Sequence, residues 1–196
     1  CSFELLDVTR EANWIALVDK VVAQYGRLDI LLNSAGIVRL ASIEDTTEEM
    51  WRLVNAVGTD GTFFGCKHAL RVMKPAGSGS IINMCSTASI SGGPGIFAYA
   101  ASKSAIRGIT KSVACLSTEN GYGVRCNSIH PGNMRTPMLQ GVQDIAQLAG
   151  ERVVREDALE ERDRGLHALD HCLAERAAHA RQRLRAIVAA DDDLRD

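Results

Sequence analysis

Short apolar runs alternate with longer amphipathic stretches through the first two-thirds of this chain, and this alternation restricts the possible folds more than any other pattern. Short apolar runs predict β-strands, and amphipathic stretches with a helical period predict helices. Strands are expected at 3–7, 28–32, 80–85 and 124–130, and helices at 10–25, 47–73 and 97–119. The alternation predicts βαβ units and an α/β fold, in which a parallel sheet carries helices on both faces.

Two of these elements have further signals. The run LDILL at 28–32 is apolar throughout, which is typical of a strand buried on both faces. The long helix begins at a cap, Thr46 or Thr47, and continues to about Met73. Its three glycines, at 58, 61 and 65, predict either a bend or close packing against a neighbouring element.

Small or hydroxyl-bearing residues come directly after three of the predicted strands. The run Asn33-Ser-Ala-Gly36 comes after one strand, Ser86 after the next, and Pro131-Gly132 after the last. Ligands of parallel sheets bind beyond the carboxyl ends of the strands, and small residues there let the backbone approach a ligand closely. Each sequence alone is compatible with a tight turn, but three at one edge of the sheet predict a binding cleft.

Tyr99 and Lys103 stand four residues apart in the predicted helix at 97–119, so they share one helix face. A phenol has an ordinary pKa of about 10, and a nearby ammonium lowers it. A hydroxyl from Ser86 can hold a carbonyl or alcohol oxygen beside the phenol. Taken alone, Tyr-x-x-x-Lys is more often a packed ring with a solvated ammonium. Together with the strand exits, the three groups suit reversible proton transfer to an oxygen.

At this point residues 7 to about 138 resemble the short-chain dehydrogenase/reductase family. The matching segments are Asp7-Val8, Asn33–Gly36, Gly61–Gly65, Ser86, Tyr99-x-x-x-Lys103, Asn127–Gly132 and Thr136–Met138. Their order and spacing together are very specific. The resemblance implies a Rossmann-like doubly wound sheet that binds NAD or NADP, with NAD favoured. It also implies hydride transfer between the nicotinamide and a secondary alcohol or ketone.

The resemblance also implies a role for each matching residue. Tyr99 would be the general acid/base, Lys103 would lower its pKa and bind the nicotinamide ribose, and Ser86 would orient the substrate oxygen. The expected cofactor contacts are Asp7, Val8, Asn33, Ala35, Gly36, Tyr99, Lys103, Pro131, Gly132 and Thr136.

The chain departs from the family pattern in three places. The glycine-rich turn that cradles a pyrophosphate does not occur, so we expect it before Cys1, with the first strand or strands of the sheet. Gly58 stands where the family has an Asn that holds a water for proton relay. Either the helix register presents Asn55 instead, or the proton relay is weakened. The family's lid and last strand are not recognisable after Met138.

Composition divides the chain near residue 140. We expect a partial Rossmann-type dinucleotide-binding and catalytic domain at 1–140 and a charged helical tail, atypical for the family, at 141–196. The tail is rich in Arg, Glu and Asp and contains no Lys. Two interpretations of it stay open: solvated surface helices, or a helical interaction module.

Charge and cysteine content exclude several classes of protein. The net charge of −2 gives no reason to expect nucleic acid or a membrane as a partner. No apolar run reaches the length of a membrane span, and the N-terminus lacks the features of a signal peptide. The six cysteines are scattered without a C-x-x-C pair, so no metal site is expected. Reduced, mostly buried thiols and a cytoplasmic location are expected.

Two functions from different classes stay open. The first is an NAD(P)-dependent oxidoreductase, homo-oligomeric in its parent protein, acting on a small and hydrophobic alcohol or ketone. Its expected pocket side chains are Ala88, Ile90, Phe97, Met134 and Met138. The alternative is a catalytically impaired or non-catalytic dinucleotide-binding or regulatory protein on the same fold. Gly58, the absent phosphate turn and the charged tail motivate it, and they predict that the 196 residues lack full activity.

Overall fold

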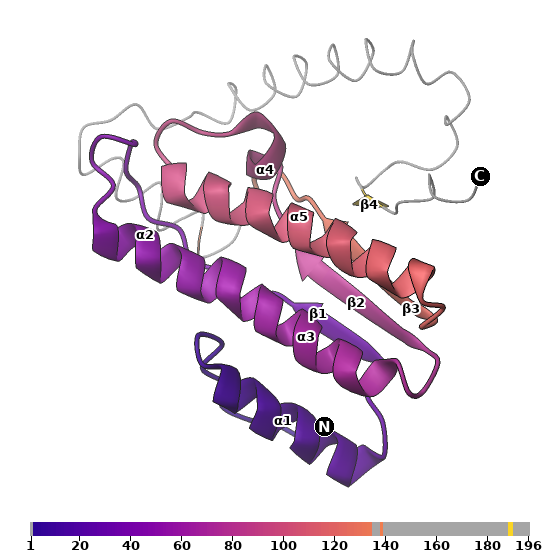
Figure 1. The fold of residues 1–196 in the computed structure, drawn as a ribbon. Coiled ribbons are helices and arrows are strands. Elements are labelled where there is room, and N and C mark those ends of the chain that lie inside the picture. The colour runs from indigo at the N-terminus through magenta and orange to yellow at the C-terminus, as the bar shows by residue number, and fades with distance from the viewer. Residues whose placement is uncertain (1, 135–137, 139–187, 190–196) are drawn as a thin grey trace, which may run out of the picture. The chain divides into compact units, whose positions relative to one another are not determined.

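Three parallel strands and one short antiparallel strand form the sheet in the computed structural model, which describes residues 2–134, 138 and 188–189. In chain order the elements are α1 (Glu11–Tyr25), β1 (Ile30–Asn33), α2 (Glu48–Asn55), the π-helical turn η1 (Ala56–Asp60), α3 (Gly61–Met73), β2 (Gly79–Met84), α4 (Ala88–Ser91), α5 (Phe97–Glu119), β3 (Val124–Ile129) and β4 (Val188–Ala189). Figure 1 shows α3 and α5 crossing in front of the strands.

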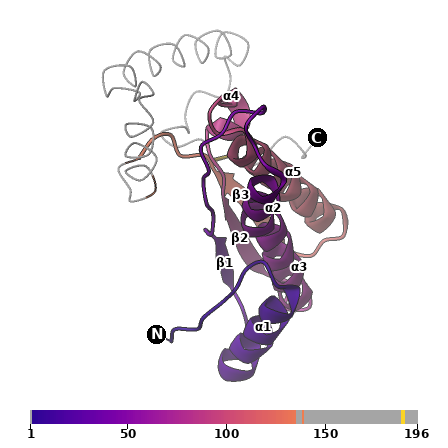
Figure 2. The same ribbon diagram turned by 90° about the vertical axis from the view of Figure 1, so that its left-hand side faces the viewer.

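The strand order is β1-β2-β3-β4. The first three strands run parallel, with Ile81 of β2 opposite Leu31 of β1 and Cys126 of β3. The two-residue β4 pairs antiparallel with β3. Parallel neighbours need crossover connections, which α2–α3 and α5 supply. The expected Rossmann-like parallel sheet is therefore confirmed. The sequence also predicts helices on both faces, whereas the described helices lie on one side of the sheet (Figure 2).

Helix α1 ends where the sequence predicts. Gly26 has a φ of +79°, and its N–H donates to the Val22 carbonyl over 2.8 Å, which is a glycine-terminated helix end. Trp14 and Val18 are the buried residues of this helix, and the Trp14 indole N–H donates to the Val8 carbonyl over 3.0 Å. This bond ties the loop before α1 to the helix itself.

The glycine-containing helix keeps its cap and divides into three parts. The Met50 N–H donates to the Thr47 hydroxyl over 3.2 Å, so Thr47 is the cap. A π-helical turn, η1, separates α2 from α3. A β-carbon built on Gly61 would lie 3.1 Å from the Val8 side chain, and Gly58 and Gly65 face other elements still more closely. The glycines therefore allow close packing, one of the two outcomes that the sequence predicts.

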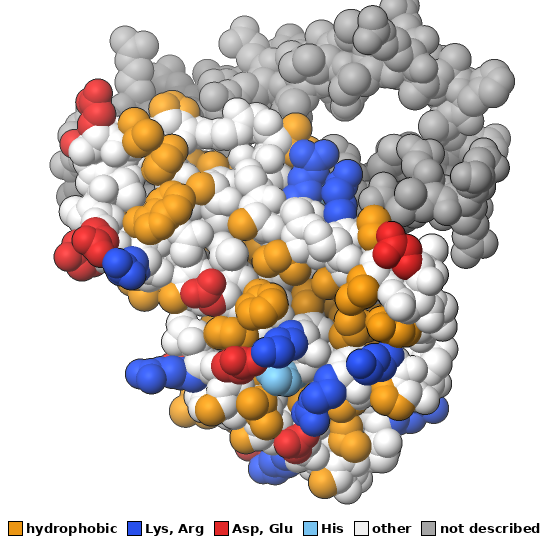
Figure 3. Space-filling view, viewed as in Figure 1, with side chains coloured by type: hydrophobic (Ala, Val, Ile, Leu, Met, Phe, Trp, Pro, Cys, Tyr) orange, Lys and Arg blue, Asp and Glu red, His pale blue; other side chains and the backbone are white. Residues whose placement is uncertain are grey.

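Apolar side chains also lie on the outward surface of the helices. Figure 3 shows them between charged groups on the face that carries α2, α3 and α5. The exposed large apolar residues on these three helices are Trp51, Leu53, Phe63 and Leu116.

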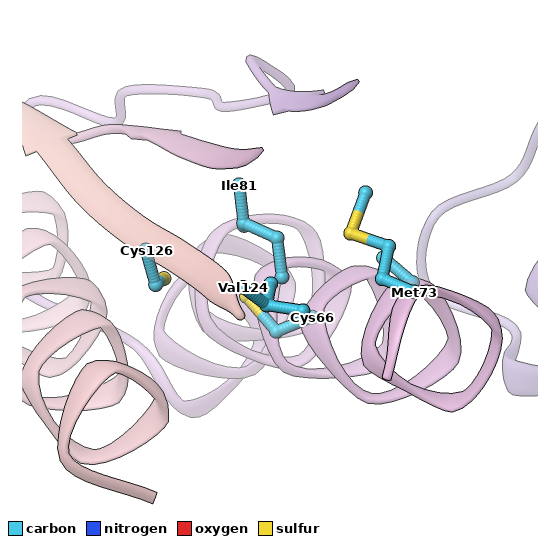
Figure 4. Close-up of a cluster of buried hydrophobic side chains, with 6 residues drawn as sticks. Cys66, Met73, Ile81, Val124 and Cys126 are labelled. Atoms are coloured by element: carbon cyan, nitrogen blue, oxygen red, sulfur yellow. The ribbon is translucent and has the colours of Figure 1, made fainter. Parts of the chain in front are cut away.

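The hydrophobic core lies between α3 and the strands β2 and β3. Figure 4 shows part of this cluster, in which Met73 and Ile81 are wholly enclosed. Its members are Cys66, Ala69, Met73, Ile81, Val124 and Cys126. Cys66, Cys85 and Cys126 are free and buried, as expected for reduced thiols.

Two expectations about the sheet are wrong. Residues 3–7 form no strand, and Phe3 and Leu5 are 87% and 92% exposed. An extended segment becomes a strand only when a neighbour pairs with its backbone, and no described strand does so here. The run at 28–32 is also not buried on both faces, because Ile30 and Leu32 are 64% and 54% exposed. In the described part of the chain, α3 packs against β1, and Figure 2 shows the helices on one side of the strands.

Apart from β4, the predicted helical tail at 141–196 lies outside the described residues. None of the described helices has the length and apolar character needed to cross a membrane.

Candidate functional site

The structure brings Ser86, Tyr99 and Lys103 together at the carboxyl end of β2. Ser86 lies in the turn between β2 and α4, while the other two residues come from the first turns of α5. The Lys103 ammonium nitrogen lies 5.6 Å from the centre of the Tyr99 ring. Ser86 lies near enough to Tyr99 to act on the pKa of the phenol. A phenol, a hydroxyl and an ammonium therefore share one site, as the spacing predicts.

Lys103 is buried in spite of its charge, with 5% of its surface exposed. Its Nζ donates to the Met84 carbonyl over 2.6 Å, which partly replaces the water it has lost. Burial nevertheless lowers the pKa of Lys103 from its ordinary value. A β-carbon built on Gly36 would lie 3.4 Å from Nζ, so Gly36 and the lysine ammonium are neighbours at the β1 exit.

The expectation that Lys103 lowers the pKa of Tyr99 is wrong for this structure. The pKa of Tyr99 is raised, because burial penalises the phenolate more than the nearby Ser86 side chain favours it. Lys103 lies beside the ring and donates to the Met84 carbonyl. Tyr99 is therefore a neutral phenol at neutral pH, ready to donate a proton.

Asp7 and Val8 lie in the loop before α1. Both the N–H and the hydroxyl of Thr9 donate to the Asp7 carboxylate, over 3.0 and 2.7 Å, and the side-chain bond is the main reason that the pKa of Asp7 is lowered. Asp7 is exposed, so its charge is available to a ligand. Val8 packs against Gly61, at the start of α3.

Asn33 ends β1 with its side chain turned into the core. Its Nδ2 donates to Asn83 Oδ1 over 2.8 Å, and its Oδ1 is buried without a hydrogen-bond partner among the described residues. Any contact of Asn33 with a ligand at this edge therefore falls to its backbone. Ala35, two residues on, is exposed, and Gly36 is partly exposed.

The residues expected at the nicotinamide side are only partly described. The Pro131 carbonyl accepts from the Thr87 N–H over 3.0 Å, which places Pro131 beside the Ser86 turn. Gly132 is exposed next to it. Thr136 lies outside the described residues.

The π-helical turn bears on the relay position. A β-carbon built on Gly58 would lie very close to Ser102 Oγ, at 2.3 Å, so the Ser102 hydroxyl occupies the space of a side chain at position 58. Asn55 donates to the Trp51 carbonyl over 2.9 Å and accepts from Thr59 over 3.1 Å. Both ends of its amide are thus engaged within its own helical segment. Of the two alternatives, the geometry favours a weakened proton relay over one in which Asn55 takes the place of the missing Asn.

Sequence reasoning missed His130. This residue is buried at the end of β3, with Nδ1 close to Ser86 and Ser89 and Nε2 close to Ser128 on β3. The available signal was a polar ring placed directly before Pro131-Gly132, at a strand exit. No group of three or more potential metal ligands occurs among the residues whose placement is described.

Known proteins resemble this chain in sequence and in fold. A family model described as "Enoyl-(Acyl carrier protein) reductase" matches residues 2–163. The chain is 44% identical over 145 residues to a 3-alpha-(or 20-beta)-hydroxysteroid dehydrogenase of Mycobacterium tuberculosis (strain CDC 1551 / Oshkosh), covering 74% of this chain and 55% of that protein. It is 40% identical over 144 residues to a cyclopentanol dehydrogenase of Comamonas sp. (strain NCIMB 9872), covering 74% and 57%.

A solved structure, "ElxO with NADP Bound", matches with a TM-score of 0.69 and 33% identity, covering 74% of this chain and 58% of that one. The chain thus spans a little over half the length of each of these proteins. The family match covers most of the sequence and agrees with the parallel sheet. This chain belongs to the short-chain dehydrogenase/reductase family.

Proposed function

We propose that this chain belongs to an NAD(P)-dependent oxidoreductase that interconverts a secondary alcohol and a ketone by hydride transfer. The observation that carries the proposal is the meeting of Ser86, Tyr99 and Lys103 at one strand exit. Two similar proteins are named as dehydrogenases of a hydroxysteroid and of cyclopentanol, which agrees with this reaction class.

Each side chain has its own part in the reductive direction. The Tyr99 hydroxyl donates its proton to the carbonyl oxygen, and the Ser86 hydroxyl donates a hydrogen bond to the same oxygen as negative charge develops there. A raised pKa suits this step, because it keeps Tyr99 protonated at neutral pH. In the oxidative direction Tyr99 must first lose that proton, so oxidation is expected to accelerate as the pH rises.

The residues at the β1 and β2 exits fit a dinucleotide. Lys103 offers a buried ammonium beside Gly36, where a ribose hydroxyl can accept a hydrogen bond. Asp7 offers an exposed carboxylate in the loop before α1, for the adenosine end. When bound, the nicotinamide supplies or accepts the hydride. The preference for NAD over NADP stays a prediction, and the NADP bound in the similar solved structure does not favour it.

We propose a small hydrophobic or cyclic substrate. Two of the expected pocket side chains, Ile90 and Met134, are exposed and thus free to contact a ligand, while Ala88 is buried. Phe97 packs against Trp51 with ring centres 5.9 Å apart, which gives this end of α5 an apolar wall. Met138 is exposed as well.

The test compares Tyr99→Phe with a matched control, Tyr25→Phe, at an exposed tyrosine on α1. Turnover is followed by the absorbance of reduced nicotinamide over a panel of secondary alcohols. Tyr99→Phe is expected to reduce kcat by about 10²–10⁴-fold, the usual contribution of a general acid/base, and to keep its dinucleotide affinity. Wild-type turnover by Tyr99→Phe would exclude the proposed role.

A second candidate is a dinucleotide-binding protein without catalysis. The observation that favours it is Gly58, because the relay position has no side chain and Asn55 is engaged elsewhere. It predicts that dinucleotide binding, measured by fluorescence, occurs without turnover of any alcohol in the panel. Turnover that depends on Tyr99 would exclude this candidate.

Three further expectations stay proposals. The exposed Phe63 on α3 and Leu116 on α5 support a homo-oligomer, which light scattering would detect. The division into a domain at 1–140 and a tail at 141–196 predicts a first proteolytic cut near residue 140. A cytoplasmic location is the third expectation, and it requires fractionation of cells that express the full gene.

A further inference from the structure

His130 links the end of β3 to the turn that carries Ser86. Its ring is buried, with 6% of the residue exposed. Nδ1 lies 3.2 Å from the Ser86 carbonyl oxygen and 3.1 Å from Ser89 Oγ. On the other side of the ring, Nε2 lies 2.9 Å from Ser128 Oγ. The ring therefore contacts both the turn after β2 and a residue of β3 itself.

These contacts determine which ring nitrogen carries the proton. A carbonyl oxygen can only accept, so the short approach to Ser86 requires an N–H at Nδ1. The Ser89 hydroxyl already donates to the same carbonyl over 2.7 Å, so its own proton is not free for Nδ1. Nε2 is then the acceptor and receives the Ser128 hydroxyl proton. Burial lowers the pKa of His130, which agrees with a neutral ring.

The backbone on either side of Ser86 is held by ordinary strand-exit bonds. The Cys85 N–H donates to the Ile129 carbonyl over 2.8 Å, and the Thr87 N–H donates to the Pro131 carbonyl over 3.0 Å. The Thr87 N–H belongs to the same peptide group as the Ser86 carbonyl, so its bond to Pro131 already helps to orient that group. The carbonyl itself accepts from the Ser89 N–H over 3.0 Å and from the Ser89 hydroxyl over 2.7 Å, both within the turn. Among the described residues, His130 is the donor that reaches this carbonyl from outside the turn.

The orientation of this peptide matters for the Ser86 side chain. Ser86 Oγ accepts from the Ala88 N–H over 3.1 Å, which uses one of its lone pairs and limits the directions open to its own proton. A rotation of the Ser86 peptide would break this bond and turn the hydroxyl away from Tyr99. The carbonyl contact and the hydroxyl direction are thus coupled within one residue.

We propose that His130 is a positioning residue for Ser86, whose Nδ1–H holds the Ser86 carbonyl and thereby aims the Ser86 hydroxyl at the oxygen that reacts. This inference rests on the proposed function, because it assigns His130 to the same reaction. A purely structural histidine, which only fills the space between the two exits, is the competing explanation.

Two substitutions separate these explanations. His130→Asn keeps an N–H donor near the position of Nδ1, whereas His130→Gln places its amide nearer to Nε2 and loses the donor to Ser86. His130→Gln is expected to reduce kcat by roughly 10–100-fold, the scale of a small misplacement of a reacting group, with dinucleotide affinity unchanged. His130→Asn is expected to retain most of kcat. Equal kcat values for the two variants would overturn the proposal.

His68 is the matched control, since it is an equally buried histidine on α3 whose Nε2 contacts Glu11 over 3.0 Å. The Gln amide lies nearer to the position of Nε2 than the Asn amide does, so His68→Gln is expected to be more stable than His68→Asn. Neither His68 variant is expected to change kcat. A comparable loss of kcat at His68 would show that any buried histidine substitution disturbs the site, and would count against His130.

A second measurement does not require turnover. Exchange of the Ala88 amide hydrogen, followed by NMR, reports whether its bond to Ser86 Oγ persists. Faster exchange is expected in His130→Gln than in His130→Asn or wild type, and equal exchange in all three would overturn the proposal. If wild type exchanges as expected but oxidises no alcohol, the proposed function fails and the positioning stands.

The third readout needs only the wild-type chain, and so remains valid if the variants do not fold. Nitrogen-15 chemical shifts of the His130 ring distinguish the two neutral tautomers. A proton on Nδ1 is expected, and a proton on Nε2 alone would refute the proposal.

Discussion

The contact between Gly58 and Ser102 yields the sharpest stability prediction. A β-carbon at position 58 would lie 2.3 Å from Ser102 Oγ but 3.5 Å from Ser102 Cβ. The first distance is far inside van der Waals contact, while the second is an ordinary contact. Ser102 is buried, and its hydroxyl lies 3.0 Å from the Thr59 hydroxyl, so it cannot move aside into solvent. One oxygen atom therefore determines whether alanine fits.

The magnitudes come from this geometry. Overpacking a buried site costs about 1–3 kcal/mol, partly offset by the roughly 0.5–1 kcal/mol that favours Ala over Gly inside a helix. Gly58→Ala is therefore expected to lower the free energy of unfolding by about 0.5–2 kcal/mol. Ser102→Ala alone is expected to lower the free energy of unfolding by about 0.5–1.5 kcal/mol, because it removes the hydrogen bond to Thr59. In the Ser102→Ala background, adding Gly58→Ala is expected to be neutral or stabilising, since the clashing oxygen is gone.

The assay is urea unfolding of wild type, the two single variants and the double variant, monitored by circular dichroism. The structure predicts a coupling free energy of about 1–3 kcal/mol between the two positions. Gly108→Ala serves as the control, because it lies on α5 with open space around the added carbon and should stabilise the chain slightly. Additive effects at 58 and 102, within about 0.5 kcal/mol, would refute the reasoning.

Three other predictions concern the core, acid stability and the titration of the phenol. Gly65→Ala would place its β-carbon 2.3 Å from Asn33 Oδ1, so we expect a loss of about 1–3 kcal/mol in urea unfolding, and an unchanged midpoint would contradict this packing. The hydrogen bond from Lys67 is the main cause of the lowered pKa of Glu11, so its stabilisation is present above a pH of about 4.3 and is lost as the pH falls through the lower folded value. Glu11→Gln should therefore be less stable than wild type at neutral pH and equally stable in strong acid, whereas a gap that persists in acid would point to another cause. Burial raises the pKa of Tyr99, so its phenolate absorbance, identified as the signal that disappears in Tyr99→Phe, should have a titration midpoint above about pH 10. The free energy of unfolding should fall as the pH rises through that midpoint. A midpoint well below about pH 10 would show that a positive charge dominates instead.

Local patterns in the sequence carried much of the fold. The four-residue spacing of Tyr99 and Lys103 is a property of any helix, so their shared face needed no tertiary information. The end of α1 at Gly26 and the cap at Thr47 are equally local, because each involves a bond within a few residues. The parallel sheet was predictable from the alternation of strand and helix patterns.

Properties that depend on neighbours distant in the sequence were not predictable in this way. Residues 3–7 have a strand pattern but no described pairing partner, and LDILL lies at a sheet position where one face is open. The pKa of Tyr99 depends on how deeply the ring is buried, which a helical spacing does not specify. The same holds for the inward turn of Asn33, which is set by Asn83 on the next strand.

The amino-acid sequence alone specifies which chemical groups this chain contains and which of them share a helix face, because helix geometry repeats every few residues. The folded arrangement was needed to learn which groups are desolvated, which carbonyl each donor reaches, and that His130 belongs beside Ser86. Solvation and hydrogen-bond partnership depend on atoms brought together from segments that lie far apart along the chain, as the separation of 44 positions between Ser86 and His130 illustrates.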